Sequence, residues 1–82
     1  MQKLPVVDSK KLLKLLNKLG YSSVRQKGSH IILKKEDSNF VHTITVPFHK
    51  EIAKGTLNDI LSEIAKYNNM KKEEILEILN SI

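Results

Sequence analysis

The stretch that decides the fold is residues 21–34, which read YSSVRQKGSHIILK. Two runs with strand-forming side chains, 21–27 and 30–34, lie on either side of Gly28 and Ser29. Glycine at the first position of a two-residue loop suits a type II′ turn, which joins antiparallel strands. The stretch therefore predicts a β-hairpin whose second strand begins directly after this turn.

A third strand is expected after the hairpin. Residues 35–39 form a polar segment typical of a turn, and residues 40–46 are rich in the β-branched side chains that favour strands. Pro47 has no backbone N–H to donate, so we expect it to end this strand. The simplest arrangement of the three segments is an antiparallel meander in sequence order.

A helix is expected before the hairpin. Leucines recur at i, i+4 and i+7 at Leu12, Leu16 and Leu19. This spacing places them on one face of a helix over residues 9–19. Asp8 or Ser9 can accept a hydrogen bond from the first free backbone N–H groups, and Gly20 can adopt the left-handed conformation that commonly ends a helix.

Two further helices are expected after the third strand. Thr56 is predicted to cap the first of them and Asn69 to cap the second. The apolar face of the first consists of Leu57, Ile60, Leu61 and Ile64. That of the second consists of Ile75, Ile78, Leu79 and Ile82. We expect the last helix, over about residues 70–80, to cap the exposed end of a small core.

These elements predict an α+β fold in one domain over residues 1–82. Its core, about 9–66, would be a helix, a three-stranded antiparallel sheet and a helix, with the C-terminal helix added. Both core helices can bury their apolar stripes on one sheet face, which leaves the other face free to meet a partner. Ile32 interrupts the apolar alternation of its strand, so the sequence does not identify the free face.

Charge is distributed unevenly along the chain. The 82 residues carry 14 basic and 9 acidic side chains, a net charge of +5. Residues 1–35 hold nine cations and one acid (9 − 1 = +8), and residues 36–82 hold five cations and eight acids (5 − 8 = −3). A basic half of this kind suits a polyanion such as a nucleic acid, although a solvated basic helix face explains part of it.

Composition excludes several classes of protein. The chain has no cysteine, which excludes disulfides and thiolate zinc sites. No apolar run approaches the length that a bilayer or a secretory signal requires, so we expect a cytoplasmic protein with no membrane contact. The spacing of the histidines matches no zinc pattern, and we expect neither a metal nor another cofactor.

Three histidines are the candidates for proton transfer. His30 follows the glycine turn among Arg25, Lys27 and other cations, a setting that suits a phosphate. It is then either a catalytic acid or base, a phosphate-binding group, or a plain surface residue. For His42, in the middle of a strand, packing is expected. His49 lies in the loop after the third strand and could approach a substrate there.

A second phosphate-binding segment is predicted at the start of the second helix. Lys54, Gly55 and Thr56 precede or open this helix, where free N–H groups and the helix dipole attract anions. Ordinary capping by Thr56 is compatible with this role. Aromatic residues make up only 5% of the chain, so contact with the RNA backbone fits better than a stacking platform for several bases.

Taken together, these motifs resemble the HicA, or YcfA-like, toxins over roughly residues 9–65. The motifs that carry the resemblance are Leu12-Leu13-Lys14-Leu15-Leu16, Gly20-Tyr21, Arg25-Gln26-Lys27-Gly28-Ser29-His30, Thr45-Val46-Pro47 and Lys54-Gly55-Thr56-Leu57. The resemblance implies a fold like that of double-stranded-RNA-binding domains. It also implies an mRNA interferase, the toxin of a type II toxin–antitoxin system, which a HicB-type antitoxin neutralises.

The resemblance also implies a role for the Gly-Ser-His motif. His30 would be the catalytic histidine, placed by Gly28 and Ser29. We expect metal-independent attack of a ribose 2′-OH on the adjacent phosphorus, with Lys27 or a nearby cation stabilising the transition state and His49 as a candidate second acid or base. The alternatives are a module that binds RNA without cutting it and a protein whose basic helix docks on an acidic partner.

Overall fold

The computed structural model describes residues 4–82, and Lys3 of the basic half lies outside this range. Three helices and three strands follow one another in the order α1, β1, β2, β3, α2, α3. Their bounds are α1 Ser9–Lys18, β1 Ser22–Lys27, β2 His30–Glu36, β3 Val41–Pro47, α2 Lys54–Tyr67 and α3 Lys72–Asn80. The expected α+β arrangement of a helix, an antiparallel sheet, a helix and an added C-terminal helix is confirmed.

The three strands form one antiparallel sheet in the order β1-β2-β3. The turn between β1 and β2 has a φ of +59° at Gly28, whereas the φ of Ser29 is negative, as a type II′ turn requires. A register shift between Ser23 and Arg25 marks a bulge in β1. β2 extends to Glu36, further than the sequence predicts.

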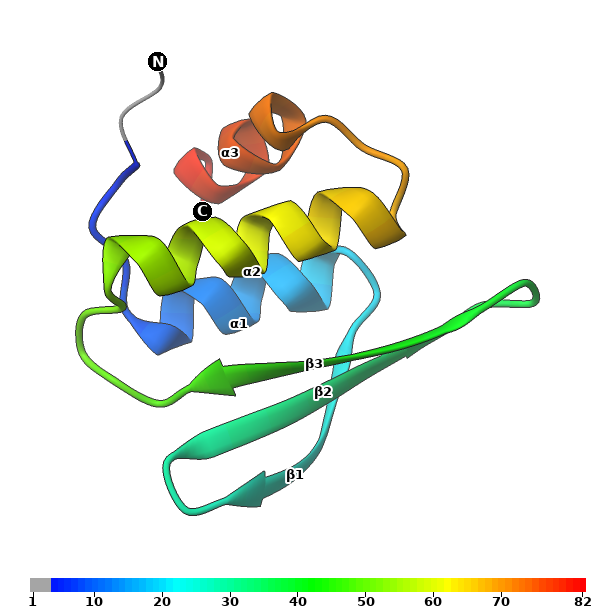
Figure 1. Ribbon diagram of the computed structural model, residues 1–82, viewed down its shortest axis with the longest axis horizontal. Helices are drawn as coiled ribbons and strands as arrows, with labels where there is room; N and C mark the ends of the chain where they lie inside the picture. The colour runs from blue at the N-terminus through cyan, green and yellow to red at the C-terminus, as the bar shows by residue number, and fades with distance from the viewer. Residues whose placement is uncertain (1–3) are drawn as a thin grey trace.

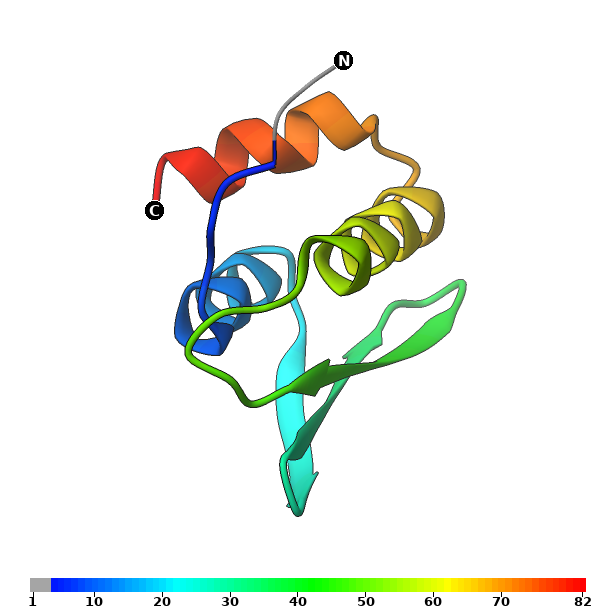
Figure 2. The same cartoon turned by 60° about the vertical axis from the view of Figure 1, so that its left-hand side comes forward.

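The molecule has three layers. Figure 2 shows the sheet as one layer, α1 and α2 side by side as the second, and α3 lying across them as the third. Figure 1 shows the same stacking from another side. α3 buries Ile75, Leu76 and Leu79 in the common core, so it covers the outer side of the helix pair, as expected.

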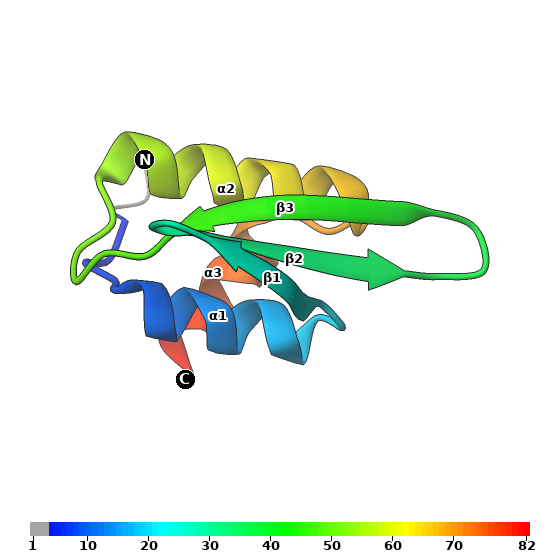
Figure 3. The ribbon, with the colours of Figure 1, turned by 90° about the horizontal axis from the view of Figure 1, so that it is seen from below.

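One sheet face is covered by helices and the other is open. Ile31 and Leu33 of β2 are buried toward α1 and α2, while Ile32 between them is half-buried on the opposite face. In β3, every second residue from His42 to Val46 is buried in the same way. Figure 3 shows the open face toward the viewer, with α1 and α2 behind it. The ambiguity that Ile32 creates in the sequence is thereby resolved.

The ends of α1 agree closely with the sequence. The Asp8 carboxylate accepts a hydrogen bond from the Lys11 N–H at 2.9 Å, so Asp8 rather than Ser9 is the N-cap. Gly20 has a φ of +98°, and the Tyr21 N–H donates to the Leu16 carbonyl at 2.9 Å. This is the Schellman ending that glycine favours.

The predicted caps of the other two helices are wrong. Ile52 is buried, and its N–H donates a hydrogen bond to the Val7 carbonyl. The chain turns into α2 directly after this anchored residue, so the helix begins at Lys54 and Thr56 lies inside its first turn. Asn69 does not cap α3. It has a φ of +53° and ends α2 instead, with the Met70 N–H donating to the Ala65 carbonyl at 3.0 Å.

Candidate nucleic-acid interface

His30 lies at one end of the open sheet face. It is the first residue of β2 and is paired with Lys27 in β1 and Pro47 in β3. Residues directly opposite each other on neighbouring strands point to the same side of a sheet. The exposed imidazole of His30 therefore stands on the uncovered face, between a cation on one strand and a proline on the other.

Two cations near His30 have no acidic partner within residues 4–82. Arg25 is paired with Ile32, so it lies on the open face two positions along from Lys27. Neither Arg25 nor Lys27 takes part in an ion pair within the described chain. Lys34, further along the same face, is paired with Glu36 at 3.0 Å. Uncompensated positive charge is thus concentrated at the His30 end of the sheet.

The turn beside His30 is held by backbone contacts. The Ser29 carbonyl accepts a hydrogen bond from the Phe48 N–H at 2.6 Å, which joins the turn to the loop after β3. The Gln26 side chain donates to the Gly28 carbonyl at 3.3 Å. A side chain at Gly28 would meet open space, so its positive φ, and not crowding, is what favours glycine here.

The start of α2 lies at the same end of the molecule. Figures 1 and 3 show the β1–β2 turn, the loop after β3 and the first turns of α1 and α2 gathered there. Lys54, Gly55 and Thr56 are exposed in the first turn of α2, and the N-cap residue Ala53 offers no side-chain acceptor. The first N–H groups of α2 are therefore free to meet an anion.

His49 lies in the loop between β3 and α2. Its backbone carbonyl accepts a hydrogen bond from the Ser9 N–H at 3.0 Å, which fixes the loop against the start of α1. Its side chain is exposed. The structure thus brings His49 to the same end of the molecule as His30, with no hydrogen bond between the two rings in the described residues.

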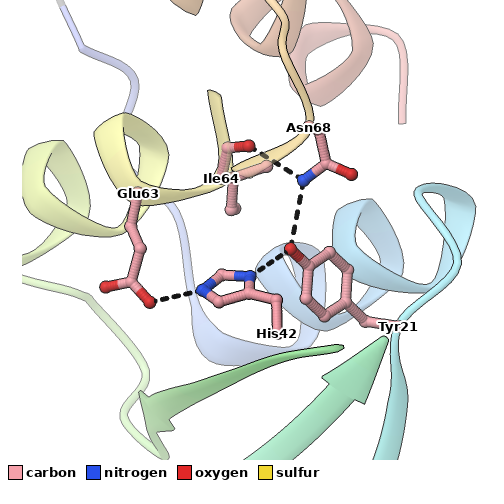
Figure 4. Close-up of polar contacts among 5 residues, drawn as sticks. All are labelled: Tyr21, His42, Glu63, Ile64 and Asn68. Carbon is pink, nitrogen blue, oxygen red and sulfur yellow. Dashed lines mark hydrogen bonds and ion pairs between the residues drawn. The ribbon is translucent and has the colours of Figure 1, made fainter. Parts of the chain in front are cut away.

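His42 lies on the opposite side of the sheet, buried under α2, as expected of a packing residue. Figure 4 shows what the sequence did not reveal, a chain of hydrogen bonds through its ring. The Tyr21 hydroxyl is 2.5 Å from Nδ1, and Nε2 is 2.7 Å from the Glu63 carboxylate. The ring also stacks on Tyr67 at 3.9 Å between centroids.

One arrangement of protons satisfies every hydrogen bond of this partly buried network. The Asn68 amide donates to the Tyr21 oxygen at 3.0 Å and to the Ile64 carbonyl at 2.8 Å. The Tyr21 hydroxyl can then donate to Nδ1 of His42, which leaves Nε2 to donate to Glu63. Burial raises the pKa of Tyr21; the Asn68 hydrogen bond opposes this rise and the Glu63 charge adds to it. The network ties the sheet to α2 and is separate from the open face.

Residues 4–82 contain no group of three or more histidine and acidic side chains that would hold a metal ion. In the same part of the chain, every helix is too short or too polar to cross a bilayer.

The chain is a small α+β domain with one sheet face covered by helices and one open face that carries His30 between Lys27 and Pro47. The sequence model of one family, described as the HicA toxin of bacterial toxin-antitoxin systems, matches residues 9–65. The chain therefore belongs to the HicA toxin family and is the toxin of a toxin–antitoxin pair. The match covers α1, the sheet and most of α2. Neither the curated proteins nor the solved structures gave a match.

Proposed function

We propose that this toxin is an endoribonuclease, an mRNA interferase that cuts RNA with His30 and is neutralised by a HicB-type antitoxin. The observation that supports it best is the position of His30. The family's Gly-Ser-His motif places this imidazole at the exposed end of the open face, with Arg25 and Lys27 uncompensated beside it. This is the arrangement that a phosphodiester needs, a proton-transfer group next to fixed positive charge.

The reaction proceeds by attack of a ribose 2′-oxygen on the adjacent phosphorus. The 2′-OH loses its proton, the bond from phosphorus to the 5′-oxygen breaks, and the departing oxygen gains a proton. The products are a 2′,3′-cyclic phosphate and a 5′-hydroxyl. His30 carries out one of the two proton transfers, and Lys27 stabilises the negative charge that develops on the phosphoryl oxygens.

His49 is our candidate for the second proton transfer. Its loop is joined to the start of α1 through Ser9 and to the His30 turn through the neighbouring Phe48. RNA bound across this end would lie between the two histidines. The phosphates that flank the cleaved bond have two sets of binding partners. One is Arg25 on the sheet, and the other is the free N–H groups at the start of α2, with Lys54 and Thr56.

The experiment compares the unchanged toxin with His30→Ala, each expressed without an antitoxin and then purified. We expect the unchanged toxin to arrest growth and to cut RNA in the presence of EDTA, and His30→Ala to do neither. A 2′-deoxy nucleotide placed at a mapped cleavage position should block cutting at that position only. Cleavage by His30→Ala, or cleavage after the deoxy nucleotide, would contradict the mechanism.

The alternative is a module that binds RNA without cutting it, which the basic open face would equally serve. Salt-sensitive binding of RNA that stays intact with the unchanged toxin would favour this alternative. If RNA binding were lost at moderate salt while an acidic protein partner stayed bound, the basic helix α1 would serve as a protein-docking surface. Co-purification with the antitoxin tests the partner directly.

A further inference from the structure

A hollow of about 550 Å³ lies beside the His30 turn, between the start of α1 and the loop after β3. This volume falls within the roughly 300–1,000 Å³ typical of ligand pockets. Its lining residues come from these two segments and are Asp8, Ser9, Lys10, Phe48, His49 and Lys50. The proton-transfer steps proposed above use only His49 from this set.

The walls of the hollow are fixed by backbone contacts. The Ser9 N–H donates to the His49 carbonyl at 3.0 Å, and the Ile52 N–H donates to the Val7 carbonyl at 2.9 Å. Val7, Ser9 and Ile52 are all buried. The loop is therefore attached to the α1 end at two points, so the hollow is formed before any ligand arrives.

The hollow combines an exposed aromatic ring with positive charge. Phe48 is 46% exposed, although a phenylalanine of a small domain would ordinarily be buried. Lys10 and Lys50 are exposed and take part in no ion pair within residues 4–82. Asp8 carries the opposing charge, but its carboxylate caps α1 through the Lys11 N–H. A ring for stacking next to two free cations matches the chemistry of a nucleotide.

One wall of the hollow is joined to the His30 turn through Phe48. Phe48 follows Pro47, the cross-strand partner of His30, and its N–H donates to the Ser29 carbonyl at 2.6 Å. The aromatic ring thus belongs to the residue that directly follows the strand position opposite the imidazole. A phosphate at His30 would have its neighbouring nucleotide at the mouth of the hollow.

We infer that this hollow is a subsite for one nucleobase of the RNA, stacked on Phe48, with Lys10 and Lys50 holding the next phosphate. The inference rests on the proposed function and deepens it. A base in a duplex is paired and stacked, so only an unpaired nucleotide can enter. The few aromatic residues of the chain exclude a platform for several bases, but a single ring at the site suffices for one.

The first test measures binding of a short single-stranded RNA to His30→Ala protein, which keeps the substrate uncut. Adding Phe48→Ala should weaken binding about 5- to 150-fold, the range that stacking of one base provides. Phe48→Tyr should restore it. Phe40→Ala is the matched control, because Phe40 precedes β3 at the far end of the sheet. Equal losses for Phe48→Ala and Phe40→Ala would overturn the subsite.

The second test uses RNAs in which one nucleotide at a time lacks its base. An abasic nucleotide at the subsite position should weaken RNA binding by the protein that keeps Phe48. The same abasic RNA should bind Phe48→Ala almost as well as the complete RNA does, because the ring and the base form one contact and either change removes it. A penalty that persists unchanged in Phe48→Ala would overturn the subsite. Lys10→Gln and Lys50→Gln should each lower the salt dependence of binding.

These outcomes separate the subsite from the proposed cleavage. Cleavage that needs His30 but is indifferent to Phe48 would overturn the subsite alone. If the abasic-RNA test shows that Phe48 and one base depend on each other for binding, but the unchanged toxin never cuts RNA, the proposed cleavage alone would be overturned. The absence of any RNA binding by the unchanged toxin would overturn both.

Discussion

Two histidines on opposite faces of the same sheet show how surroundings decide what an imidazole does. His30 is exposed at the end of β2, with cations beside it. His42 is 4% exposed in β3, with both ring nitrogens hydrogen-bonded and its face stacked on Tyr67. The buried ring of His42 lies under α2, out of reach of a substrate on the open face, whereas the exposed ring of His30 is accessible there. We therefore assign reactivity to the first and stability to the second.

The largest expected effect is on the reactivity of His30. Replacing it with Gln removes the titratable nitrogen while keeping a polar side chain, so cleavage should fall by roughly 10²- to 10⁴-fold. The free energy of unfolding should stay within about 0.5 kcal/mol of the unchanged protein, as for other exposed positions. Single-turnover RNA cleavage and urea unfolding measure the two quantities. A His30→Gln protein that is active or strongly destabilised would invalidate the contrast between the two histidines.

His42 should show the reverse pattern. His42→Ala leaves a cavity and removes the hydrogen-bond partner of the Tyr21 hydroxyl and of the Glu63 carboxylate, so the free energy of unfolding should drop by roughly 2–4 kcal/mol. For a domain of this size the melting temperature would fall by about 10–25 °C. Thermal and urea unfolding measure the loss. RNA cleavage below the new melting temperature should remain near that of the unchanged protein, and its abolition there would contradict a purely structural role.

Much of this contrast was predictable from particular residues. The β-branched residues of 40–46 predict the strand in which His42 packs, and Gly28 predicts the turn that presents His30. The free face was not predictable, because Ile32 is apolar like its two neighbours and only helix packing distinguishes them. The resemblance to the HicA family, and not local spacing, favoured catalysis by His30.

Features that depend on contacts between distant segments were missed. The Tyr21–His42–Glu63–Asn68 network joins residues from three distant segments of the chain, and no local pattern marks a buried histidine's partners. The hollow at Phe48 forms because the loop after β3 packs on the start of α1. The N-cap residues of α2 and α3 are wrong in the sequence prediction for a similar reason, since backbone anchoring at Ile52 and the left-handed Asn69 outweigh the capping preferences of single residues.

A smaller effect is expected for the cations beside His30. Arg25→Gln and Lys27→Gln should each weaken RNA binding several-fold and reduce the slope of log affinity against log salt by about 0.7–1, because each removes one phosphate contact. Titrations at several salt concentrations measure both. Lys66→Gln is the control, since Lys66 lies in the last turn of α2, over the Tyr67 ring. An equal change in slope for Lys66→Gln would show that overall charge, and not the open face, drives binding.

The smallest effect concerns the proton of Tyr21 in the buried network. Burial raises the pKa of its hydroxyl above the ordinary value of 10.0, the Asn68 hydrogen bond opposes this and the Glu63 charge reinforces it. Because the folded protein holds this proton more tightly than the unfolded chain, the resulting stability is complete below about pH 10. It is lost as the pH rises through the folded pKa.

Tyr21→Phe isolates this contribution. The variant should be less stable by about 1–2 kcal/mol at pH 8, since it loses the hydrogen bonds that join the Tyr21 hydroxyl to His42 and Asn68, and this difference should shrink as the pH rises above 10. Urea unfolding from pH 8 to 11 measures the difference, and Tyr67→Phe is the control because Tyr67 is exposed and lies outside the hydrogen-bond chain. A difference that stays constant over this range would mean that the Tyr21 hydroxyl does not couple the network to pH. The distinction between the two sheet faces would then rest on the burial of His42 alone.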